Sequence, residues 1–420
     1  MNFFAYKKNS LYCEDVPVGE IVREVGTPAY IYSLATLRRH FQVFDMAFSE
    51  IPHFVCYSVK ANSNISIIKV FANMGSGVDI VSGGELYRSL RAGVKPSKMV
   101  YSGVGKKDWE IVLSLEKRIL MFNVESWEEL NNIDTIAGKM HTKAPVAFRV
   151  NPDVDPKTHP YISTGMRENK FGIDINESLK LYKKAKKLKN IELIGVDCHI
   201  GSQLTDVLPF VETVEIISGF VEKLRKMGIN IRYVDIGGGL GITYRDERPP
   251  DPVEYANVIV SALKNLGVTL ILEPGRVLTG NAGILVTEVL YTKATKDRNF
   301  FIVDAAMNDL QRPSLYGSYH EIVPVKRGGR KTTVADVVGP ICESGDFLAK
   351  EREMPMLKRG DLLGVFSAGA YGFAMSSNYN SRPRAVEVLV DGARYEIIRE
   401  RESLKDIVRG ENISSFLKKR

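Results

Sequence analysis

One lysine stands where an apolar run of the sequence ends. The run His53–Tyr57 predicts a buried strand, and Lys60 follows it among small polar residues that extend to Asn64. Burial lowers the pKa of an amine until part of it is neutral, and the neutral amine of a lysine forms a Schiff base with an aldehyde. A lysine that leaves a strand end for solvent would look the same over these few residues, so the rest of the chain has to decide between the two.

Polar residues or glycines lie in, or directly after, four other apolar runs. Backbone N–H groups of consecutive glycines can approach an anion closely, as they do in loops that hold phosphate groups. Three glycines in a row could equally be a flexible turn, and their place between a strand and a helix is what favours an anion site. In chain order, these residues are Asp79, His199, Ser202, Gly237, Gly238, Gly239, Glu273, Pro274, Gly275 and Arg276.

A reactive lysine, a glycine-rich anion loop and a buried glutamate are together the parts of a pyridoxal 5'-phosphate site. Lys60 would hold the aldehyde of this cofactor, the glycines and Ser202 its phosphate, and Glu273 its pyridine nitrogen. A carboxylate keeps that nitrogen protonated, so that the ring accepts electrons. His199 could stack on the ring, although a single histidine at a strand end is more often a core residue.

The elements that must position these residues alternate regularly. Apolar runs alternate with amphipathic helical stretches over about 230 residues, close to the usual size of a closed (β/α)₈ barrel of about 250. Catalytic residues of such a barrel lie at the C-terminal ends of its strands, and a phosphate site often follows strands seven and eight. An open, doubly wound sheet would usually have fewer strands and a GxGxxG after the first. The eight runs are Phe54–Val59, Val78–Val81, Met99–Ser102, Leu120–Val124, Pro145–Val150, Leu193–His199, Tyr233–Ile236 and Thr269–Leu272, and each except the last is followed by a predicted helix.

A second domain is predicted after Gly280, where strands are separated mainly by turns and loops. Two strands near the start, Phe3–Cys13 and Ala29–Ser33, flank a helix at Val18–Val25 and have no partner in the barrel, so we expect them to join this second domain. The prediction is thus a barrel of residues 34–279 and a β-sandwich or β-barrel domain of residues 1–33 and 280–420. Its later strands are predicted at Val286–Thr295, Phe300–Asp304, Glu321–Lys326, Thr332–Val338, Leu362–Phe366, Ala385–Val390 and Tyr395–Arg399.

The composition is ordinary for a soluble globular enzyme, with 420 residues, of which 44% are hydrophobic and 25% charged. The net charge of +7 is spread along the chain without an aromatic-interleaved basic patch, so no nucleic-acid partner is expected. Neither a signal peptide nor an apolar run of membrane-spanning length is present, and no membrane partner is expected. Cys13, Cys56, Cys198 and Cys342 form no CxxC pair, which favours reduced thiols in the cytoplasm and no metal site.

Motifs spread over nearly the whole chain resemble those of one enzyme family. They are Tyr57–Asn62, Asn151–Asp155, His159–Gly165, Lys170–Gly172, His199–Gln203, Glu273–Arg276 and Gly339–Asp346. These motifs resemble the diaminopimelate decarboxylase family, within the alanine-racemase-like, ornithine-decarboxylase-like group of pyridoxal phosphate enzymes. The resemblance implies a barrel joined to a β domain. It also implies decarboxylation of meso-2,6-diaminopimelate to L-lysine and CO₂, the last step of lysine biosynthesis.

The resemblance also implies which residues bind the cofactor. Lys60 would carry it covalently, and His199 would stack on it. Gly239, the segment Glu273–Arg276 and Tyr371 would bind it as well, with Tyr371 near the phosphate.

Other roles implied by the resemblance concern the substrate. Arg276, Arg312 and Tyr316 would hold the distal carboxylate of diaminopimelate. Glu343 would hold its distal amine, and Cys342 would protonate the carbon that loses CO₂. In this family the last two residues reach the site from the partner subunit, which implies a homodimer with shared active sites.

Three alternatives remain open at this stage. An ornithine or arginine decarboxylase has no distal carboxylate to bind and would more often show Cys-Asp in place of Cys342-Glu343. An amino-acid racemase of the same group would use a tyrosine as its second base, and a non-catalytic cofactor-binding relative would lack the β domain.

For Arg312 and Tyr316, spaced four residues apart, one face of a plain surface helix is the simpler interpretation.

Overall fold

The computed structural model describes residues 2–155 and 170–417, so the motif His159–Gly165 lies outside the described residues. Backbone contacts divide the chain into two compact units. The barrel unit is Thr36–Gly280, and the β unit combines Met1–Ala35 with Asn281–Arg420.

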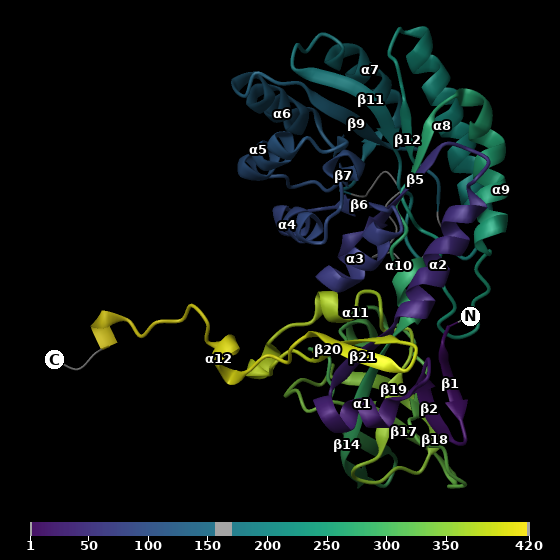
Figure 1. Cartoon of the computed structure of the whole chain (residues 1–420), viewed down its shortest axis with the longest axis vertical. Coiled ribbons are helices and arrows are strands. Elements are labelled where there is room, and N and C mark those ends of the chain that lie inside the picture. Colours follow the sequence, from purple (N-terminus) through teal and green to yellow (C-terminus); the bar gives the residue numbers. More distant parts are fainter. Residues whose placement is uncertain (1, 156–169, 418–420) are drawn as a thin grey trace. The chain divides into compact units, whose positions relative to one another are not determined.

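Eight parallel strands form a closed barrel in the barrel unit (Figure 1). Each strand pairs with the next along the chain, and the eighth pairs with the first, so the predicted closed barrel is confirmed. All eight strands begin and end within two residues of the predicted bounds. They are β5 (His53–Ser58), β6 (Gly77–Ile80), β7 (Met99–Tyr101), β8 (Met121–Val124), β9 (Ala144–Asn151), β11 (Ile191–Asp197), β12 (Tyr233–Asp235) and β13 (Thr269–Leu272), and the two-residue β10 (Ile173–Asp174) pairs with β9.

Helices connect successive strands and surround the barrel (Figure 1). Several begin at an Asn, Ser or Asp whose side chain accepts a hydrogen bond from an amide two or three residues further on, which satisfies a donor at the helix start. These capping residues are Asn64, Ser82, Ser126, Asp174 and Asp251. The helices are α2 (Leu34–Ala47), α3 (Ile65–Asn73), α4 (Gly83–Arg91), α5 (Asp108–Lys117), α6 (Trp127–Lys139), α7 (Ile175–Ala185), α8 (Leu208–Lys226), α9 (Pro252–Leu263) and the four-residue α10 (Arg276–Thr279), which follows the last strand where no helix was predicted.

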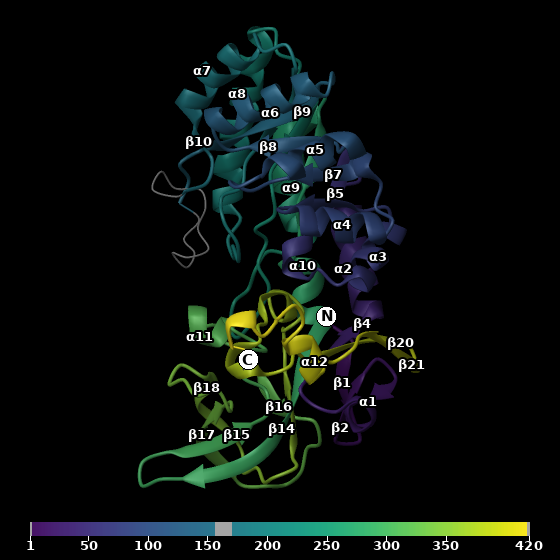
Figure 2. The ribbon, with the colours of Figure 1, turned by 90° about the vertical axis from the view of Figure 1, so that its left-hand side faces the viewer.

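The β unit is built on one large mixed sheet (Figure 2). Its strands lie in the order β18 (Phe347–Pro355), β17 (Thr332–Val338), β15 (Asn299–Val303), β14 (Gly283–Ala294), β4 (Ala29–Ser33), β20 (Val386–Asp391) and β21 (Arg394–Arg399). Two further strands, β16 (Ile322–Pro324) and β19 (Leu362–Val365), extend from β14. Because β4 pairs with both β14 and β20, the predicted addition of an N-terminal strand to this sheet is confirmed.

The β unit differs from the prediction in two strands, of which one was predicted wrongly and one was missed. Phe3–Cys13 is not one strand, because Lys8 and Asn9 adopt positive φ and turn the chain between β1 (Phe4–Lys7) and β2 (Ser10–Cys13). Together with β3 (Val16–Pro17) these form a small separate sheet, which precedes α1 (Val18–Val25). The edge strand β18 was not predicted, because its middle consists of charged, mostly exposed residues.

Among the described residues, no helix is long and apolar enough to cross a membrane.

Candidate active site

The inward-facing residues of the barrel strands change from apolar to polar near the C-terminal ends. A buried apolar cluster contains Cys56, Val100, Met121, Ala147 and Ile271, each from a different strand. Successive side chains of a strand point to opposite faces, so the residue two positions further on points the same way. The residues two positions after these five are Ser58, Ser102, Asn123, Arg149 and Glu273, which are all polar. Asp79, Asp197 and Asp235 are buried at the ends of the other three strands, and we call all eight residues the polar layer.

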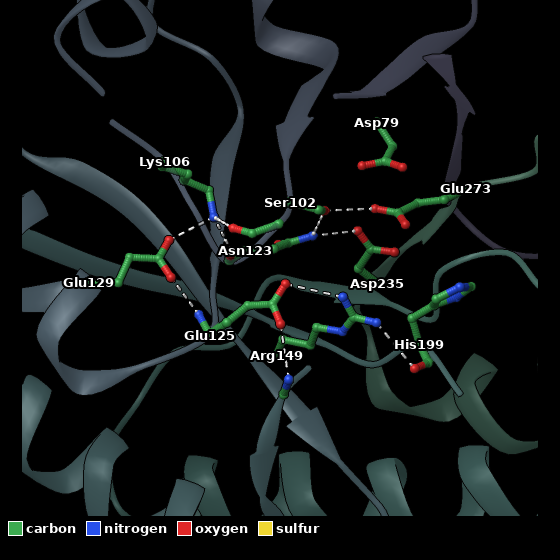
Figure 3. Close-up of polar contacts among 12 residues, drawn as sticks. Asp79, Ser102, Lys106, Asn123, Glu125, Glu129, Arg149, His199, Asp235 and Glu273 are labelled. Atoms are coloured by element: carbon green, nitrogen blue, oxygen red, sulfur yellow. Dashed lines mark hydrogen bonds and ion pairs between the residues drawn. The ribbon is translucent and has the colours of Figure 1, made fainter. Parts of the chain in front are cut away.

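Side chains of the polar layer are hydrogen-bonded across the barrel interior (Figure 3). The Asn123 Nδ2 group on β8 donates to Ser102 Oγ at 3.1 Å and to Asp235 Oδ2 at 3.2 Å. Ser102 Oγ in turn donates to Glu273 Oε1 at 3.4 Å. Because Asn123 and Asp235 belong to strands that are not neighbours in the barrel, these bonds connect four members of the layer across its interior.

Backbone hydrogen bonds join the neighbouring strand ends beside this layer. The Glu273 amide donates to Gly237 O at 2.7 Å, and the Ser58 amide donates to Pro274 O at 3.1 Å. Ser58 Oγ donates to Asp79 Oδ2 at 2.9 Å and is within 3.0 Å of Glu273 O. The chain segments that carry most of the predicted cofactor residues are therefore held together at one end of the barrel.

Lys60 lies in a short 3₁₀ turn, Val59–Ala61, directly after β5. Its ammonium group forms an ion pair with Asp79, whose side chain is completely buried. The Lys60 side chain is partly buried, with 35% of it exposed, so it lies between the buried amine and the solvent-exposed lysine that the sequence left open. Lys60 is thus partly accessible from solvent, and the charge of its ammonium group is balanced by the buried carboxylate of Asp79.

His199 follows β11 and contacts the three consecutive glycines Gly237–Gly239, which we call the glycine segment. Its Nδ1 atom accepts a hydrogen bond from the Gly238 amide at 3.2 Å. Burial, with further contributions from the positive charges of Arg149 and Lys60, holds the pKa of His199 well below its usual value. The imidazole is therefore neutral near neutral pH, with Nδ1 as an acceptor, and its ring can lie against an apolar or aromatic ligand without the cost of burying a charge.

The glycine segment has no room for side chains. Gly237 has a φ of 67°, and a Cβ there would overlap the His199 ring. A Cβ at Gly238 would overlap the carbonyl oxygen of Glu273. Glycine is therefore required at both positions for the backbone to pass so close to the neighbouring strand ends.

Three carboxyl groups of the polar layer lie on consecutive strands of the barrel or directly after them. Asp197 and Asp235 are register partners on β11 and β12, and Glu273 follows β13. Burial, followed by the negative charges of Asp235 and Asp79, raises the pKa of Glu273 well above its usual value. Burial likewise raises the pKa of Asp235 to about 6 and that of Asp197 well above its usual range.

Arg276 provides a buried cation near the same strand ends. Its guanidinium group donates to Tyr244 Oη at 2.6 Å and to Ser202 Oγ at 3.1 Å. The structure thus brings together two predicted residues, Arg276 and Ser202, with Tyr244, which the sequence analysis missed. A buried guanidinium beside hydroxyl groups is suited to bind phosphate or carboxylate oxygens.

A second ion pair inside the barrel was also missed. Arg149 on β9 forms an ion pair with Glu125 at 3.1 Å, and its other terminal nitrogen donates to His199 O at 3.4 Å (Figure 3). The same carboxylate accepts the Gly172 amide at 2.9 Å. A signal was present in the sequence, because Arg149 is the only charged residue within an otherwise apolar strand.

The β unit carries the remaining predicted residues. Arg312 and Tyr316 begin and end the helix α11 (Arg312–Tyr316). Arg312 is buried, with 5% of its surface exposed, and its guanidinium contacts His320 Nε2 at 2.9 Å and Ser318 Oγ at 3.2 Å. A surface role for Arg312 is therefore excluded, although the helical spacing of the pair is confirmed.

Cys342 and Glu343 lie in an exposed loop after β17. Asp346 fixes this loop by accepting the amides of Met307 at 2.7 Å and Ile341 at 2.8 Å. The Cys342 amide donates to Asn380 Oδ1 at 2.8 Å. Cys342 is thus exposed, whereas Cys13, Cys56 and Cys198 are buried.

Tyr371 also lies in a loop of the β unit. It adopts a φ of 55°, in the left-handed region that is uncommon for residues other than glycine. The buried pair Ala370 and Gly372 flanks it, so the loop backbone is anchored on both sides of a partly exposed tyrosine.

Comparison with known proteins defines the class to which this site belongs. Residues 34–280 match the family model of the pyridoxal-dependent decarboxylases, pyridoxal binding domain. The matched range covers the whole barrel, including the Lys60–Asp79 ion pair and the glycine segment. The protein is thus a barrel enzyme that depends on pyridoxal phosphate, as the residues at its strand ends indicated.

Relatives of known activity narrow this class. The chain is 52% identical over 409 residues to a diaminopimelate decarboxylase of Haemophilus influenzae, covering 97% of this chain and 98% of that protein. A crystal structure of the diaminopimelate decarboxylase of Helicobacter pylori complexed with L-lysine is 43% identical, with a TM-score of 0.90 over 93% of this chain and 98% of that one. The corresponding structure from M. jannaschii, also with L-lysine, is 37% identical, with a TM-score of 0.94 over 99% and 98% of the two chains. The chain belongs to the diaminopimelate decarboxylase family.

The residues present fit pyridoxal 5'-phosphate. A partly exposed lysine, Lys60, is available for its aldehyde, and a buried carboxyl group, Glu273, is available for its ring nitrogen. Glycines that admit no Cβ, together with Ser202 and the buried Arg276, offer amide, hydroxyl and guanidinium donors for its phosphate. Among the described residues, no cluster of His, Cys, Asp and Glu suited to a metal ion is present.

The close packing at Gly238 generates the first prediction. Gly238→Ala should lower the affinity of the apoprotein for pyridoxal 5'-phosphate by at least about tenfold, because the new Cβ would displace the loop from Glu273. A spectrophotometric titration with the cofactor measures this affinity.

Gly219→Ala is the matched control, because a Cβ at this position in α8 meets no atom within 4 Å. It should leave the affinity unchanged and stabilise the protein slightly, by about 0.5–1 kcal/mol. Equal cofactor affinity in Gly238→Ala and the wild type would show that this loop does not shape the cofactor site.

Proposed function

We propose that this protein decarboxylates meso-2,6-diaminopimelate to L-lysine and CO₂ with pyridoxal 5'-phosphate as its cofactor. The observation that carries the proposal is the solvent-accessible Lys60 amine, paired with the buried Asp79 at the end of a barrel that matches the pyridoxal-dependent decarboxylases. Membership of the diaminopimelate decarboxylase family supports the choice of substrate.

The barrel unit would hold and activate the cofactor. When bound, the cofactor supplies a ring that accepts the electron pair left by the departing CO₂. Lys60 would bind its aldehyde, the neutral His199 would lie against its ring, and Glu273 would hold the ring nitrogen. The glycine segment, Ser202 and the β-unit residue Tyr371 would hold the phosphate.

The two ends of the substrate require different partners. A distal carboxylate needs cations, and a guanidinium offers two parallel hydrogen bonds to it. Arg312 is suited to this role because His320 and Ser318 hold its guanidinium in a buried position. We propose that Arg276 and Tyr316 assist Arg312 and that Glu343 binds the distal amine.

Cys342 would donate a proton to the carbon that has lost CO₂. Its thiol is exposed and its loop is fixed by Asp346, so a proton donor is available at a defined position of the β unit. A positioned cysteine thiol can act as a general acid toward a carbanion.

Substrate choice supplies the second prediction. Arg312→Ala should lower kcat/KM for meso-diaminopimelate by roughly 10- to 150-fold, because a charge-assisted hydrogen bond worth about 1.5–3 kcal/mol is lost. Release of CO₂ and formation of L-lysine measure the activity. Arg330→Ala, which removes an exposed arginine of the same unit, is the control and should retain wild-type activity.

Two results would contradict the substrate assignment. One is a wild-type protein that prefers ornithine over meso-diaminopimelate. The other is an Arg312→Ala protein that uses meso-diaminopimelate as well as the wild type does.

We further propose that the active protein is a homodimer in which Cys342 and Glu343 complete the site of the partner subunit. The third prediction follows. Lys60→Ala and Cys342→Ala proteins should each be nearly inactive, whereas a mixture that exchanges subunits should regain about a quarter of wild-type activity. Half of the randomly formed dimers are mixed, and each mixed dimer has one intact and one doubly damaged site.

Mixed dimers should first be demonstrated by a size or charge tag on one of the two proteins. Absence of recovered activity in a preparation that contains mixed dimers would reject the shared site and leave the cofactor assignment to Lys60 intact.

A further inference from the structure

The polar layer contains more buried acids than cations. Its one cation, Arg149, pairs with Glu125, and Lys60, which follows β5, pairs with Asp79. Asp197, Asp235 and Glu273 remain, and for none of them does the described part of the chain record an ion pair at hydrogen-bonding distance. Buried carboxyl groups this close together cannot all be ionised, so the trio keeps protons at pH values where exposed carboxylates have lost them.

Hydrogen-bond donors decide which member of the trio carries the negative charge. Asp235 accepts the Gly237 amide at 2.9 Å and Asn123 Nδ2 at 3.2 Å. Glu273 accepts only the long bond of 3.4 Å from Ser102 among the side-chain bonds of the described residues. One oxygen of Asp197, Oδ1, has no hydrogen-bond partner among those residues. Asp235 is therefore the acid that is best stabilised as an anion.

Asp235 and Glu273 are also direct neighbours. Their side chains lie beside each other in Figure 3, and the negative charge of Asp235 raises the pKa of Glu273, whereas the neighbouring Glu273 works against the rise in the pKa of Asp235. With the anion on Asp235, the retained proton belongs to Glu273.

We propose that Asp235 positions a proton on Glu273 by keeping this residue protonated in the cofactor-free protein. Glu273 passes this proton to the ring nitrogen when the cofactor binds. The inference rests on the proposed function, because it takes Glu273 as the partner of that nitrogen. In the transfer, the O–H bond of the Glu273 carboxyl breaks and an N–H bond forms on the ring. Glu273 becomes a carboxylate and the ring nitrogen becomes cationic, so charge and atoms balance without a further reactant.

Other charged groups that face Glu273 act in both directions. Asp79 on β6 adds negative potential and favours the proton, as Asp197 on β11 does when it is ionised, whereas Lys60 after β5 and Arg149 on β9 oppose it. Burial of Glu273 favours the proton as well. Asp235 differs from these groups because it is both in contact with Glu273 and held as an anion by two donors, so its removal should have a specific effect.

The fourth prediction concerns protons exchanged on cofactor binding. Titration calorimetry of the apoprotein with pyridoxal 5'-phosphate, in buffers of different ionisation enthalpy near neutral pH, counts these protons. In Asp235→Asn, Glu273 loses its anionic neighbour and starts from a more ionised state. This variant should take up more protons from solvent than the wild type, by up to about one per site. Its amide oxygen can still accept the Gly237 amide, so the loop is preserved.

Asp309→Asn is the matched control. Asp309 is a buried aspartate of the β unit that accepts the Ala306 amide, and burial raises its pKa to about 7. Its replacement should leave the number of protons taken up on cofactor binding unchanged. A proton count in Asp235→Asn equal to that of the wild type would overturn the role of Asp235.

A measurement on the wild type keeps the proposal testable if Asp235→Asn does not fold. The infrared difference spectrum between holoprotein and apoprotein should show the loss of a protonated-carboxyl C=O band. A spectrum without this loss would overturn the proton transfer, while the appearance of the cofactor's visible absorption would leave the proposed function in place. A wild-type protein that binds no cofactor would instead overturn both.

Discussion

The charge balance inside one end of the barrel is the constraint on which the site depends. Parallel strands direct alternate side chains inward, and in this chain the last inward position of nearly every strand is polar. Desolvation makes each of these groups costly unless it is paired or neutralised. The Lys60–Asp79 and Arg149–Glu125 ion pairs solve this for four groups, and hydrogen-bond donors stabilise Asp235. Burial raises the pKa of Asp197 and of Glu273 well above the usual value, which favours their neutral forms.

The same constraint explains why the site is both rigid and reactive. Asn123, Ser102 and Asp235 form hydrogen bonds that cross the barrel, and the strand ends are joined by backbone bonds at Glu273 and Ser58. A network of this kind keeps a buried carboxyl and a neutral imidazole in place without a metal ligand. The reactive amine of Lys60, by contrast, is placed in a turn beyond the strand, where a ligand can reach it.

Most of the fold could be predicted from the sequence because apolar runs and amphipathic helices alternate strictly through the barrel. The strand ends then pointed to Lys60, Asp79, His199 and Glu273 as candidate site residues. Some of the residues missed at the sequence level lie within strands. Asp197 and Asp235 were included in apolar runs, and only the register of β11 with β12 places them beside each other. Pairings such as Asn123 with Asp235 connect residues that are distant in sequence, and no local pattern predicts them.

Predictions for the β unit were less complete, for two physical reasons. Strand β18 is charged along its middle because it forms an edge of the sheet, so its composition does not resemble that of a buried strand. The loop residues Cys342, Glu343 and Tyr371 have no periodic pattern, and their roles came only from resemblance to a family. The burial of Arg312 was not predicted either, since it depends on His320 and Ser318, which follow after a turn.

The proposed chemistry depends on Lys60 as the residue that binds the cofactor. Reduction of the holoprotein with borohydride, followed by digestion and mass spectrometry, identifies the lysine that carries the pyridoxyl group. We expect a yellow protein whose visible absorption disappears on reduction and whose label is found on the peptide that contains Lys60. A label on any other lysine would contradict this expectation.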